Sequence, residues 1–485
     1  MSSLFAAVDI GASSGRVIVG AVGAGAADLQ VVHRFPNGVV ERAGSLFWDI
    51  EGLFEQVLVG LTAAAEHAAA RGSSIASIGI DTWAVDYGLV AADGTLAGPV
   101  FSYRDGRGAT AVADVHGIVA PEKLYEVSGL QHLPFNTIFQ LATERDLTDK
   151  QALLIPDLLA YFLTGERRSE STNASTTGLY DAVAESWSSE LLGALDLPRY
   201  LFPALVEQGE VIGTLRAESA ERTGLPLVTR VVAVGSHDTA SAVAAVPATT
   251  PNFAYISSGT WSLVGVELDQ PVLSEASRLA NFTNERGVDG TIRYLRNVGG
   301  LWLLSESIRT WEQEAHDAGS PALRQSLLPL SLPELLAAAA AEPSGGPLID
   351  VDSEDFIAPG QMPERILAAA RAGGGALESR PAAVVRCILD SLAASYARTL
   401  AQAQELSGKP VEVIHIVGGG SQNTLLCQLT ADAAGLPVVA GPVEATALGN
   451  VLIQARAAGA APEALEGLRA IVAASHPGIR YVPRG

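Results

Sequence analysis

The chain has 485 residues, a length that exceeds one ordinary core and predicts two domains. It carries 31 basic against 53 acidic residues, and this net charge of −22 disfavours binding to nucleic acid or to an anionic membrane surface. Its two cysteines, Cys387 and Cys427, exclude a disulfide framework and a cysteine-based zinc site.

The N-terminal segment MSSLFAAVDIGASSGR has no cationic stretch and reaches Asp9 after a very short apolar run. This pattern is typical of a first strand and not of a signal peptide. No stretch of the chain approaches membrane-spanning length without a charge or a proline. We therefore expect a cytoplasmic protein that binds neither membrane nor nucleic acid.

The first half begins with a predicted β-hairpin. Phe5–Asp9 and Arg16–Val22 are β-type runs joined by the turn GASSG. Asp49 then caps a predicted helix that ends near Gly72, because its apolar residues recur at helical spacing. The strands that follow are Ile75–Ile80, which runs into DTWAVDY, and Val228–Val234, which leads to the loop GSHD and the small-residue segment TASAVAAV.

The second half repeats this order. Phe253–Ile256 enters the turn SSGT and leaves through Trp261–Val266. A long helix is predicted from about Arg380 to Leu406, with Pro381 in its first turn and Gly408 just past its end. The strands Val411–Val417, before GGGSQN, and Leu436–Ala440, before a loop and a small-residue helix, complete the series.

The shared order predicts a distant internal duplication, with a boundary near Val246–Asn252 and domains at 1–247 and 248–485. The segments VVAVGSHDTASAV and PVVAGPVEATALGNV also share one plan, a buried strand, a loop with one acid and tiny side chains. Helices of such small residues can cross at close range. The Ala-, Pro- and Gly-rich region at about 319–375 reads as an insertion of short helices and loops.

GASSG also satisfies the G-x-S-x-G pattern of serine hydrolases, but that motif needs a helix after the turn and the sequence RVIVGAV predicts a strand. No G-x-x-x-x-G-K-[ST] segment occurs, which excludes a P-loop kinase. Two glycine- and hydroxyl-rich turns at equivalent places in two similar halves instead indicate a phosphate site. Their glycines let backbone N–H groups approach phosphate oxygens without help from a lysine.

Three further features complete the predicted nucleotide and reaction sites. Asp9 precedes the first turn, where a carboxylate can hold Mg²⁺ directly or through water. The segment VGGGSQN (Val417–Asn423) suits a flat adenine ring or a phosphate at a helix start. Asp238 follows an apolar strand and is the candidate acceptor for the proton that leaves a hydroxyl during phosphoryl transfer. A helix N-cap is the alternative reading of Asp238.

The blocks GASSGR, GIDTWAVDY, SHDTASAV, SSGTWSLVG, GLWLL, VGGGSQNTLL and GPVEATALGN resemble the FGGY carbohydrate kinases, in order and at consistent spacing up to about Leu452. The resemblance implies an α/β fold of two actin-like, ribonuclease H-like domains with a cleft between them. It also implies the phosphorylation of L-rhamnulose at the O1 hydroxyl with Mg-ATP.

The same resemblance implies the site residues. Asp238 would be the proton acceptor, and the sugar would contact Ala84, His237, Asp238, Thr239 and Asn297. ATP would contact Ala12, Ser13, Ser14, Gly15, Arg16, Thr260, Ser305, Gly418, Gly419 and Gly420.

Two positions depart from the family pattern. Ala84 stands where a sugar-contacting glycine is usual, and its added methyl could narrow the sugar pocket. Ser305 stands where a glutamine usually contacts ATP, so Ser305 could reach ATP through water. The alternatives are a kinase for L-fuculose or a pentulose, and a non-enzymatic actin-like ATPase that regulates other proteins. We expect a monomer or a homodimer.

Overall fold

The computed structural model describes residues 3–23, 25–317 and 331–484 and divides into two compact units. Unit 1 comprises Met1–Thr249, Glu267–Leu295 and Glu444–Pro477, and unit 2 comprises Thr250–Val266, Arg296–Val443 and Gly478–Gly485. The chain thus passes between units after Thr249 but returns twice to unit 1. Part of the predicted insertion, at 318–330, lies outside the described residues.

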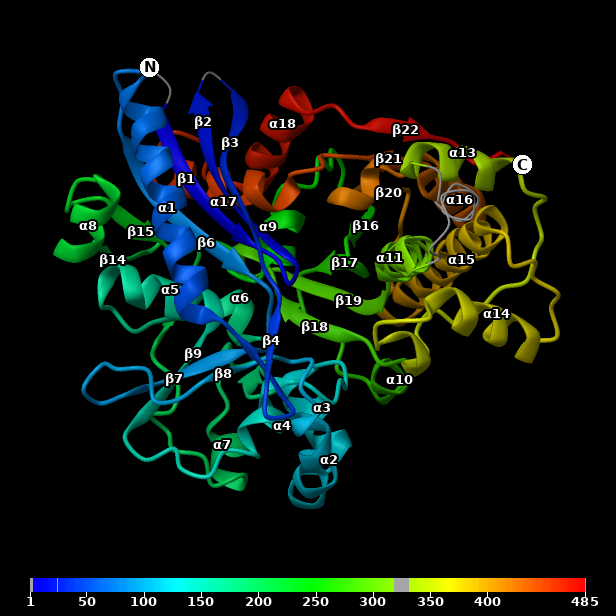
Figure 1. Cartoon of the computed structure of the whole chain (residues 1–485). Helices are drawn as coiled ribbons and strands as arrows, with labels where there is room; N and C mark the ends of the chain where they lie inside the picture. The colour runs from blue at the N-terminus through cyan, green and yellow to red at the C-terminus, as the bar shows by residue number, and fades with distance from the viewer. Residues whose placement is uncertain (1–2, 24, 318–330, 485) are drawn as a thin grey trace. The chain divides into compact units, whose positions relative to one another are not determined.

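Unit 1 is a mixed α/β unit (Figure 1). Its strands are β1 (Ser3–Ile10), β2 (Ser14–Gly23), β3 (Ala26–Pro36), β4 (Val39–Arg42), β5 (Ser45–Trp48), β6 (Ile75–Thr82), β7 (Tyr87–Ala91), β8 (Val100–Phe101), β9 (Lys150–Leu154), β10 (Ser169–Glu170), β11 (Tyr180–Asp181), β12 (Ser186–Trp187), β13 (Leu205–Val206), β14 (Val211–Thr214), β15 (Arg230–Val232) and β18 (Thr283–Arg286). Its helices are α1 (Ile50–Ala69), α2 (Arg107–Ile118), α3 (Pro121–Ser128), α4 (Thr137–Leu141), α5 (Ile155–Thr164), α6 (Ser171–Ala174), α7 (Ser189–Ala194), α8 (Ala217–Thr223), α9 (Asp238–Ala244), α10 (Glu275–Leu279), α17 (Ala445–Ala457) and α18 (Leu465–Ser475), with the 3₁₀ turn η1 (Val288–Gly290).

The main sheet of unit 1 has the order β14-β15-β6-β1-β2-β3. The predicted hairpin is confirmed, since β1 and β2 pair antiparallel around the GASSG turn. Strand β6 runs parallel to β1, and β15 runs parallel to β6. The register places Arg16 and Asp81 on either side of Asp9, so three charged residues lie side by side across three strands.

Two helices pack on opposite faces of this sheet because of glycines. Gly60 brings α1 against Val17 of β2, while Gly20 of the same strand meets Val451 of α17. Residues 17 and 20 lie on opposite faces because side chains alternate along a strand. The predicted cap of α1 is confirmed, since the Asp49 side chain accepts a hydrogen bond from the Gly52 N–H.

Unit 2 contains strands β16 (Phe253–Ser258), β20 (Val413–Val417), β21 (Val438–Ala440) and β22 (Ile479–Tyr481). Two further strands, β17 (Trp261–Leu268) and β19 (Ile292–Gly299), run from one unit's residues into the other's. Its helices are α11 (Trp302–Asp317), α13 (Leu332–Ala341), α14 (Met362–Ala372), α15 (Pro381–Ser407) and α16 (Thr424–Ala434), with the 3₁₀ turns η2 (Glu354–Phe356) and η3 (Gly419–Gln422).

The sheet of unit 2 repeats the strand order of unit 1. Counted from the hairpin side, the order is β3-β2-β1-β6-β15-β14 in the first sheet and β18-β19-β17-β16-β20-β21-β22 in the second, where β18 is an additional strand next to β19. In each, the strand of the glycine turn pairs antiparallel with its hairpin partner and parallel with the strand on its other side, and the last pair is antiparallel. This matched order supports the predicted duplication.

The two small-residue helices do cross at close range. Helices α9 and α17 pack against each other within unit 1, and a Cβ at Gly449 would overlap the Ser241 carbonyl oxygen. The long helix is also confirmed, because α15 begins at Pro381 and ends at Ser407, and Gly408 caps it in the left-handed conformation. The predicted strand Val228–Val234 is shorter, since β15 spans three residues. No helix in the described ranges is long and apolar enough to cross a bilayer.

Candidate active site

Backbone and side-chain hydrogen bonds fix the GASSG turn, and its two serines lie at the surface. The Gly11 N–H donates to the Ser14 carbonyl at 2.9 Å, which closes the turn. Just after β3, the Asn37 amide Nδ2 donates to the Gly11 carbonyl at 2.8 Å, and the Asn37 N–H donates to the Ser13 carbonyl at 3.1 Å. Ser13 and Ser14 are exposed. The turn is therefore fixed while its hydroxyl groups face solvent, as a phosphate-binding turn requires.

Arg16 holds Asp9 and Glu444 together. Its Nε and Nη2 donate to Asp9 Oδ2 at 3.0 and 2.8 Å, and its Nη1 lies 2.8 Å from Glu444 Oε2. Burial raises the pKa of Asp9 above its ordinary value, although the Arg16 guanidinium acts in the opposite direction. Arg16 thus neutralises the carboxylate that the sequence singles out for magnesium.

Asp9 belongs to a group of acidic residues at the carboxyl-terminal ends of strands β1 and β6. Burial raises the pKa of Asp81 well above its ordinary value, and the charges of Asp9 and Asp238 raise it further. Asp81 Oδ2 accepts a 2.6 Å hydrogen bond from Asn450 Nδ2, and its other oxygen, Oδ1, is a buried atom without a hydrogen-bond partner among the described residues. Like charges so close together favour a cation nearby.

These residues fit a magnesium ion whose coordination shell is completed by oxygen atoms of the substrate. In the described ranges, no three His, Cys, Asp or Glu side chains can hold a metal by themselves. Mg²⁺ usually takes one or two carboxylates and completes its shell with phosphate and water oxygens. Both side-chain hydrogen bonds of Asp9 go to Oδ2, so Oδ1 is the oxygen that suits the ion.

Asp238 is the first residue of α9 and not a loop residue, and His237 is the N-cap. The carboxyl end of β6 positions it, because Thr82 forms a parallel bridge with His237 and its N–H donates to the Ser236 carbonyl at 2.9 Å. The Thr239 hydroxyl donates to Asp238 Oδ1 at 3.1 Å, and His237 Nε2 lies 3.5 Å from the same oxygen.

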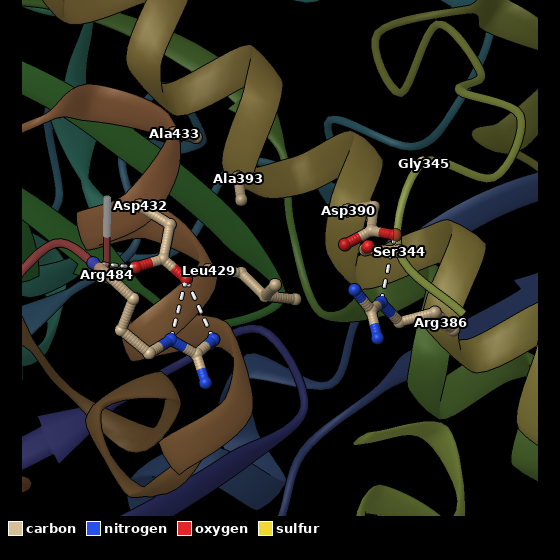
Figure 2. A pocket seen from close by; sticks show the side chains of 9 residues that line it. All are labelled: Ser344, Gly345, Arg386, Asp390, Ala393, Leu429, Asp432, Ala433 and Arg484. Carbon is tan, nitrogen blue, oxygen red and sulfur yellow. Dashed lines mark hydrogen bonds and ion pairs between the residues drawn. The ribbon is translucent and has the colours of Figure 1, made fainter. Parts of the chain in front are cut away.

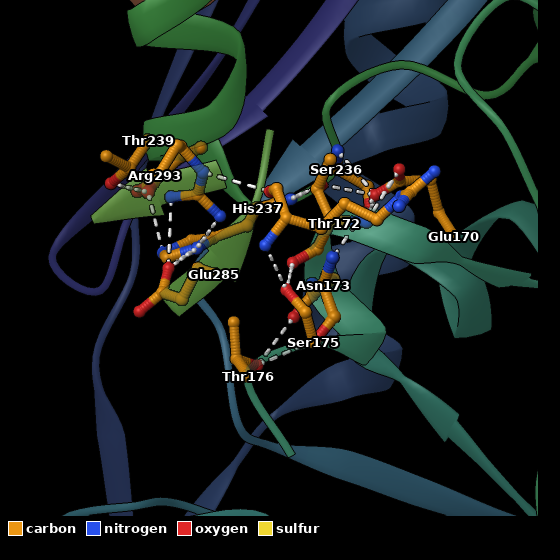
Figure 3. A network of polar contacts seen from close by, with 12 residues as sticks. Glu170, Thr172, Asn173, Ser175, Thr176, Ser236, His237, Thr239, Glu285 and Arg293 are labelled. Atoms are coloured by element: carbon orange, nitrogen blue, oxygen red, sulfur yellow. Dashed lines mark hydrogen bonds and ion pairs between the residues drawn. The ribbon is translucent and has the colours of Figure 1, made fainter. Parts of the chain in front are cut away.

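A buried glutamate fixes the backbone that precedes Asp238 (Figure 3). Glu170 Oε2 accepts from the Ser236 N–H at 3.0 Å and from the Ser236 hydroxyl at 2.7 Å. The same oxygen accepts from the Thr172 hydroxyl at 2.5 Å. Because the N–H and hydroxyl groups of both Thr172 in α6 and Ser236 donate to this one carboxylate, the Ser236 loop has little freedom.

Ala84 lies in a strained turn after β6. The next residue, Val85, has a φ of 67°, which is rare for a β-branched side chain. The Thr137 hydroxyl donates to the Val85 carbonyl at 2.7 Å, and the Asp86 N–H donates to the Ala84 carbonyl at 2.9 Å. Such conformations concentrate at ligand sites, where the surrounding contacts maintain them. Ala84 itself is half-buried.

The carboxylate of Asp86, which follows Val85, accepts hydrogen bonds that stabilise this turn. Its Oδ2 accepts from Nε1 of Trp48 at 2.6 Å and of Trp83 at 2.9 Å, and from the Tyr103 N–H at 3.0 Å. Its Oδ1 accepts from Gln140 Nε2 at 3.0 Å. Burial raises the pKa of Asp86 to about 6, although these four donors act to lower it.

In unit 2, the predicted ATP residues lie on contiguous segments. Trp302 N–H donates to the Thr260 carbonyl at 3.2 Å, so the SSGT turn contacts the start of α11. Gly420 packs so closely on Ser258 that a Cβ would collide with the serine hydroxyl. Gly418 has a φ of 82°, which its neighbour Gly419 does not share. Ser305, in the first turn of α11, is exposed.

Asn297, on β19, belongs to unit 2, whereas the other predicted sugar residues belong to unit 1.

A cavity of about 480 Å³ in unit 2 includes none of the predicted residues (Figure 2). It lies between α15 and α16, and each of its two arginines pairs with an aspartate. Arg386 Nε is 2.9 Å from Asp390 Oδ2, and Arg484 Nη2 is 2.8 Å from Asp432 Oδ2. Because both cations are already neutralised, the cavity presents no net charge to a phosphate.

Sequence reasoning missed the charged residues that support the candidate site. Glu170, Glu285 and Arg293 are buried but lie in polar stretches that read as surface. Glu444 carried a signal, because it is the single acid in the loop that matches the SHD loop of the first half.

Comparison with known proteins identifies both halves of the chain. Residues 4–245 match the N-terminal domain of the FGGY family of carbohydrate kinases, and residues 254–458 match its C-terminal domain. The chain is 42% identical to a rhamnulokinase of Bacteroides thetaiotaomicron, with 100% of this chain and 96% of that protein covered. It is 41% identical to a rhamnulokinase of Enterococcus faecalis (94% and 89% covered) and 38% identical to one of Bacillus subtilis (94% and 90%).

Solved structures share the fold. A ligand-bound xylulose kinase of Lactobacillus acidophilus matches with a TM-score of 0.78 at 15% identity, over 99% of this chain and 94% of that one. A gluconate kinase of the same organism matches with a TM-score of 0.77 at 16% identity, over 100% and 94%. At such identities the likeness concerns the fold, and it confirms the predicted two-domain α/β architecture.

Proposed function

The chain belongs to the FGGY family of carbohydrate kinases, and we propose that it transfers the γ-phosphoryl group of ATP to the O1 hydroxyl of L-rhamnulose. The products are L-rhamnulose 1-phosphate and ADP, and the reaction serves L-rhamnose breakdown. The observation that carries this proposal is the full-length similarity to three bacterial rhamnulokinases.

Asp238 is the proton acceptor in this proposal. Transfer to a hydroxyl needs an in-line arrangement and one base for the proton that leaves the attacking oxygen. The contacts of the Asp238 carboxylate in the described ranges, with Thr239 and His237, both involve Oδ1. Oδ2 has no hydrogen bond from a donor within residues 3–23, 25–317 and 331–484, so we assign to it the proton from the sugar O1.

In this proposal, the GASSG and SSGT turns both contribute contacts to the nucleotide. We assign ATP contacts to Ala12, Ser13, Ser14, Gly15, Arg16, Thr260, Ser305, Gly418, Gly419 and Gly420. Bound Mg²⁺ neutralises charge on the β- and γ-phosphates. Asp9 Oδ1 would hold that ion while Arg16 keeps the other oxygen occupied.

The residues that we assign to the sugar come from both predicted domains. Ala84, His237, Asp238 and Thr239 in residues 1–247 would bind the ketose, and Asn297 in residues 248–485 would add a contact. A cytoplasmic location and a monomeric or homodimeric state stay predictions.

The deciding experiment measures ADP release with Mg-ATP across a panel of ketoses that includes L-rhamnulose, L-fuculose and two pentuloses. The proposal expects the highest kcat/KM with L-rhamnulose. A higher value with another ketose would reassign the substrate. Sugar-independent ADP release alone would favour an actin-like ATPase regulator and would overturn the proposal.

A further inference from the structure

The hairpin of β18 and β19 carries a buried ion pair. Glu285 and Arg293 are register partners on these antiparallel strands, and Arg293 Nη1 lies 3.0 Å from Glu285 Oε2. Arg293 is fully buried and also donates from Nε to the Arg286 carbonyl at 3.1 Å. A buried ion pair adds little net stability, because desolvation offsets the attraction between the charges. Its position therefore points to a role other than stability.

That pair contacts the residue next to the predicted base (Figure 3). Glu285 Oε2 lies 3.1 Å from His237 Nδ1, and Arg293 Nη2 lies 3.2 Å from the same nitrogen. The other ring nitrogen, Nε2, faces Asp238 Oδ1 at 3.5 Å. The imidazole thus lies between two carboxylates, that of Glu285 and that of Asp238.

Glu285 is suited to hold the ring because it stays ionised. Burial alone raises the pKa of a carboxyl group, but Arg293 and His237 hold the pKa of Glu285 below its ordinary value. An ionised carboxylate only accepts hydrogen bonds and a guanidinium only donates them, so Nδ1 either donates to Glu285 or accepts from Arg293, and the two groups together hold this side of the ring. Arg293 Nη1 pairs with Oε2 of the same carboxylate and so restricts the rotation of the Glu285 side chain.

We propose that Glu285 and Arg293 are positioning residues that fix the His237 ring, and through it the Oδ1 oxygen of Asp238, so that Oδ2 points to the sugar hydroxyl. This inference rests on the proposed kinase function. The hairpin acts through His237 and need not touch either substrate. A base misplaced by a fraction of an ångström slows transfer more than it weakens binding.

A double-mutant cycle tests whether the pair acts through His237. Glu285→Gln should lower kcat about tenfold to a hundredfold and leave the KM for ATP within about twofold. In a His237→Asn background the same change should cost less than about twofold, because the ring that it orients is gone. Multiplicative effects of the two changes would overturn the proposal.

Glu267→Gln is the matched control. Glu267 pairs with Arg469, which is buried, at 2.8 Å. Within the described ranges, the ion pairs and hydrogen bonds given for the His237 ring are with Asp238, Glu285 and Arg293. The control should lower the unfolding temperature as Glu285→Gln does and leave kcat unchanged. An equal fall of kcat in the control would show a loss of stability only and would contradict the positioning role.

A second measurement does not depend on catalysis. In protein labelled with ¹⁵N-histidine, the His237 ring signals are those missing from the His237→Asn spectrum. Glu285→Gln should shift both ring nitrogens, and Glu267→Gln should not. Unmoved signals in Glu285→Gln would overturn the inference. If the wild-type protein phosphorylates no ketose, the proposed function fails, while this spectrum still decides whether Glu285 sets the state of the ring.

Discussion

Asp9 and Asp81 are register partners on the parallel strands β1 and β6, so two buried carboxylates lie next to each other near the carboxyl-terminal ends of these strands. Burial raises the pKa of both carboxyl groups, the charge of Asp9 raises that of Asp81 further, and the charge of Asp238 raises both. Arg16 neutralises one side of Asp9 only. A magnesium ion on the other side would relieve the remaining repulsion, which links metal binding to this register.

Asp9→Asn should therefore weaken the effect of magnesium on nucleotide binding. In the wild-type protein, Mg²⁺ should increase the affinity for ADP, and in the variant this increase should fall about tenfold, because a neutral amide binds the ion poorly. Titration calorimetry with ADP, with and without Mg²⁺, measures the difference. Asp114→Asn, at an exposed position of α2, is the control and should keep the full magnesium effect. An undiminished effect in Asp9→Asn would remove Asp9 from the metal site.

Asp238→Asn should reduce kcat by about a thousandfold or more, because the amide cannot accept the sugar proton. The KM for ATP and the affinity for ADP should stay within about threefold, since the change preserves shape and leaves the glycine turns intact. Steady-state ADP release and ADP titration measure the two quantities. Turnover near the wild-type level would show that another group accepts the proton.

Asp86 makes stability depend on pH. Its pKa is about 6 in the folded protein and close to 3.8 in the unfolded chain, so folding favours the protonated form. The stability that Asp86 contributes is fully present below pH 3.8 and is lost as the pH rises through 6. Between pH 4.5 and pH 7.5 this loss amounts to about 2 kcal/mol.

Asp86→Asn removes this titration, although it also removes an acceptor from the indoles of Trp48 and Trp83. The variant should be less stable than the wild-type protein at pH 4.5, and the gap should narrow by about 2 kcal/mol at pH 7.5. Urea unfolding at both pH values measures the gap. A gap that stays constant with pH would mean that Asp86 does not titrate in this range.

Local patterns predicted the parts of the fold that local chemistry determines. The GASSG turn, the Asp49 cap and the Pro381–Gly408 limits of α15 follow from short stretches of sequence. The duplicated strand order also followed, because both halves repeat the same series. The sequence also singles out Asp238 as the candidate proton acceptor, since a lone acid after an apolar strand is a local feature, and this role stays a prediction.

The supporting charges could not be predicted this way. Glu170 binds Ser236 from 66 residues away, and Arg293 meets His237 from 56 residues away. Whether a polar stretch is buried depends on which distant segment covers it, and periodicity does not report that. The buried pair on β18 and β19 therefore reads as surface until the hairpin is placed against α9.

Ala84→Gly should enlarge the sugar pocket and change binding more than chemistry. The half-buried methyl group lies on the strained turn that Val85 and Asp86 maintain. Its loss should change the KM for L-rhamnulose about three- to tenfold and leave kcat and the KM for ATP within about twofold, because one methyl group in a pocket corresponds to roughly 1 kcal/mol or more. Kinetics across the ketose panel measure both. Identical KM values for every ketose would place Ala84 away from the sugar.

Gly449→Ala should disturb the start of α9 through its packing. A Cβ at this position of α17 would overlap the Ser241 carbonyl, which belongs to the helix that begins at Asp238. Because backbone cannot give way as a flexible side chain can, we expect a loss of about 2 kcal/mol or more in stability, together with a lower kcat. Gly117→Ala, in α2, meets no atom within 4 Å and should be neutral or stabilise by about 0.5 kcal/mol. Unfolding curves and ADP release on both variants separate a general cost of replacing glycine from the contact of α17 with α9, and equal stability in the two would refute that contact.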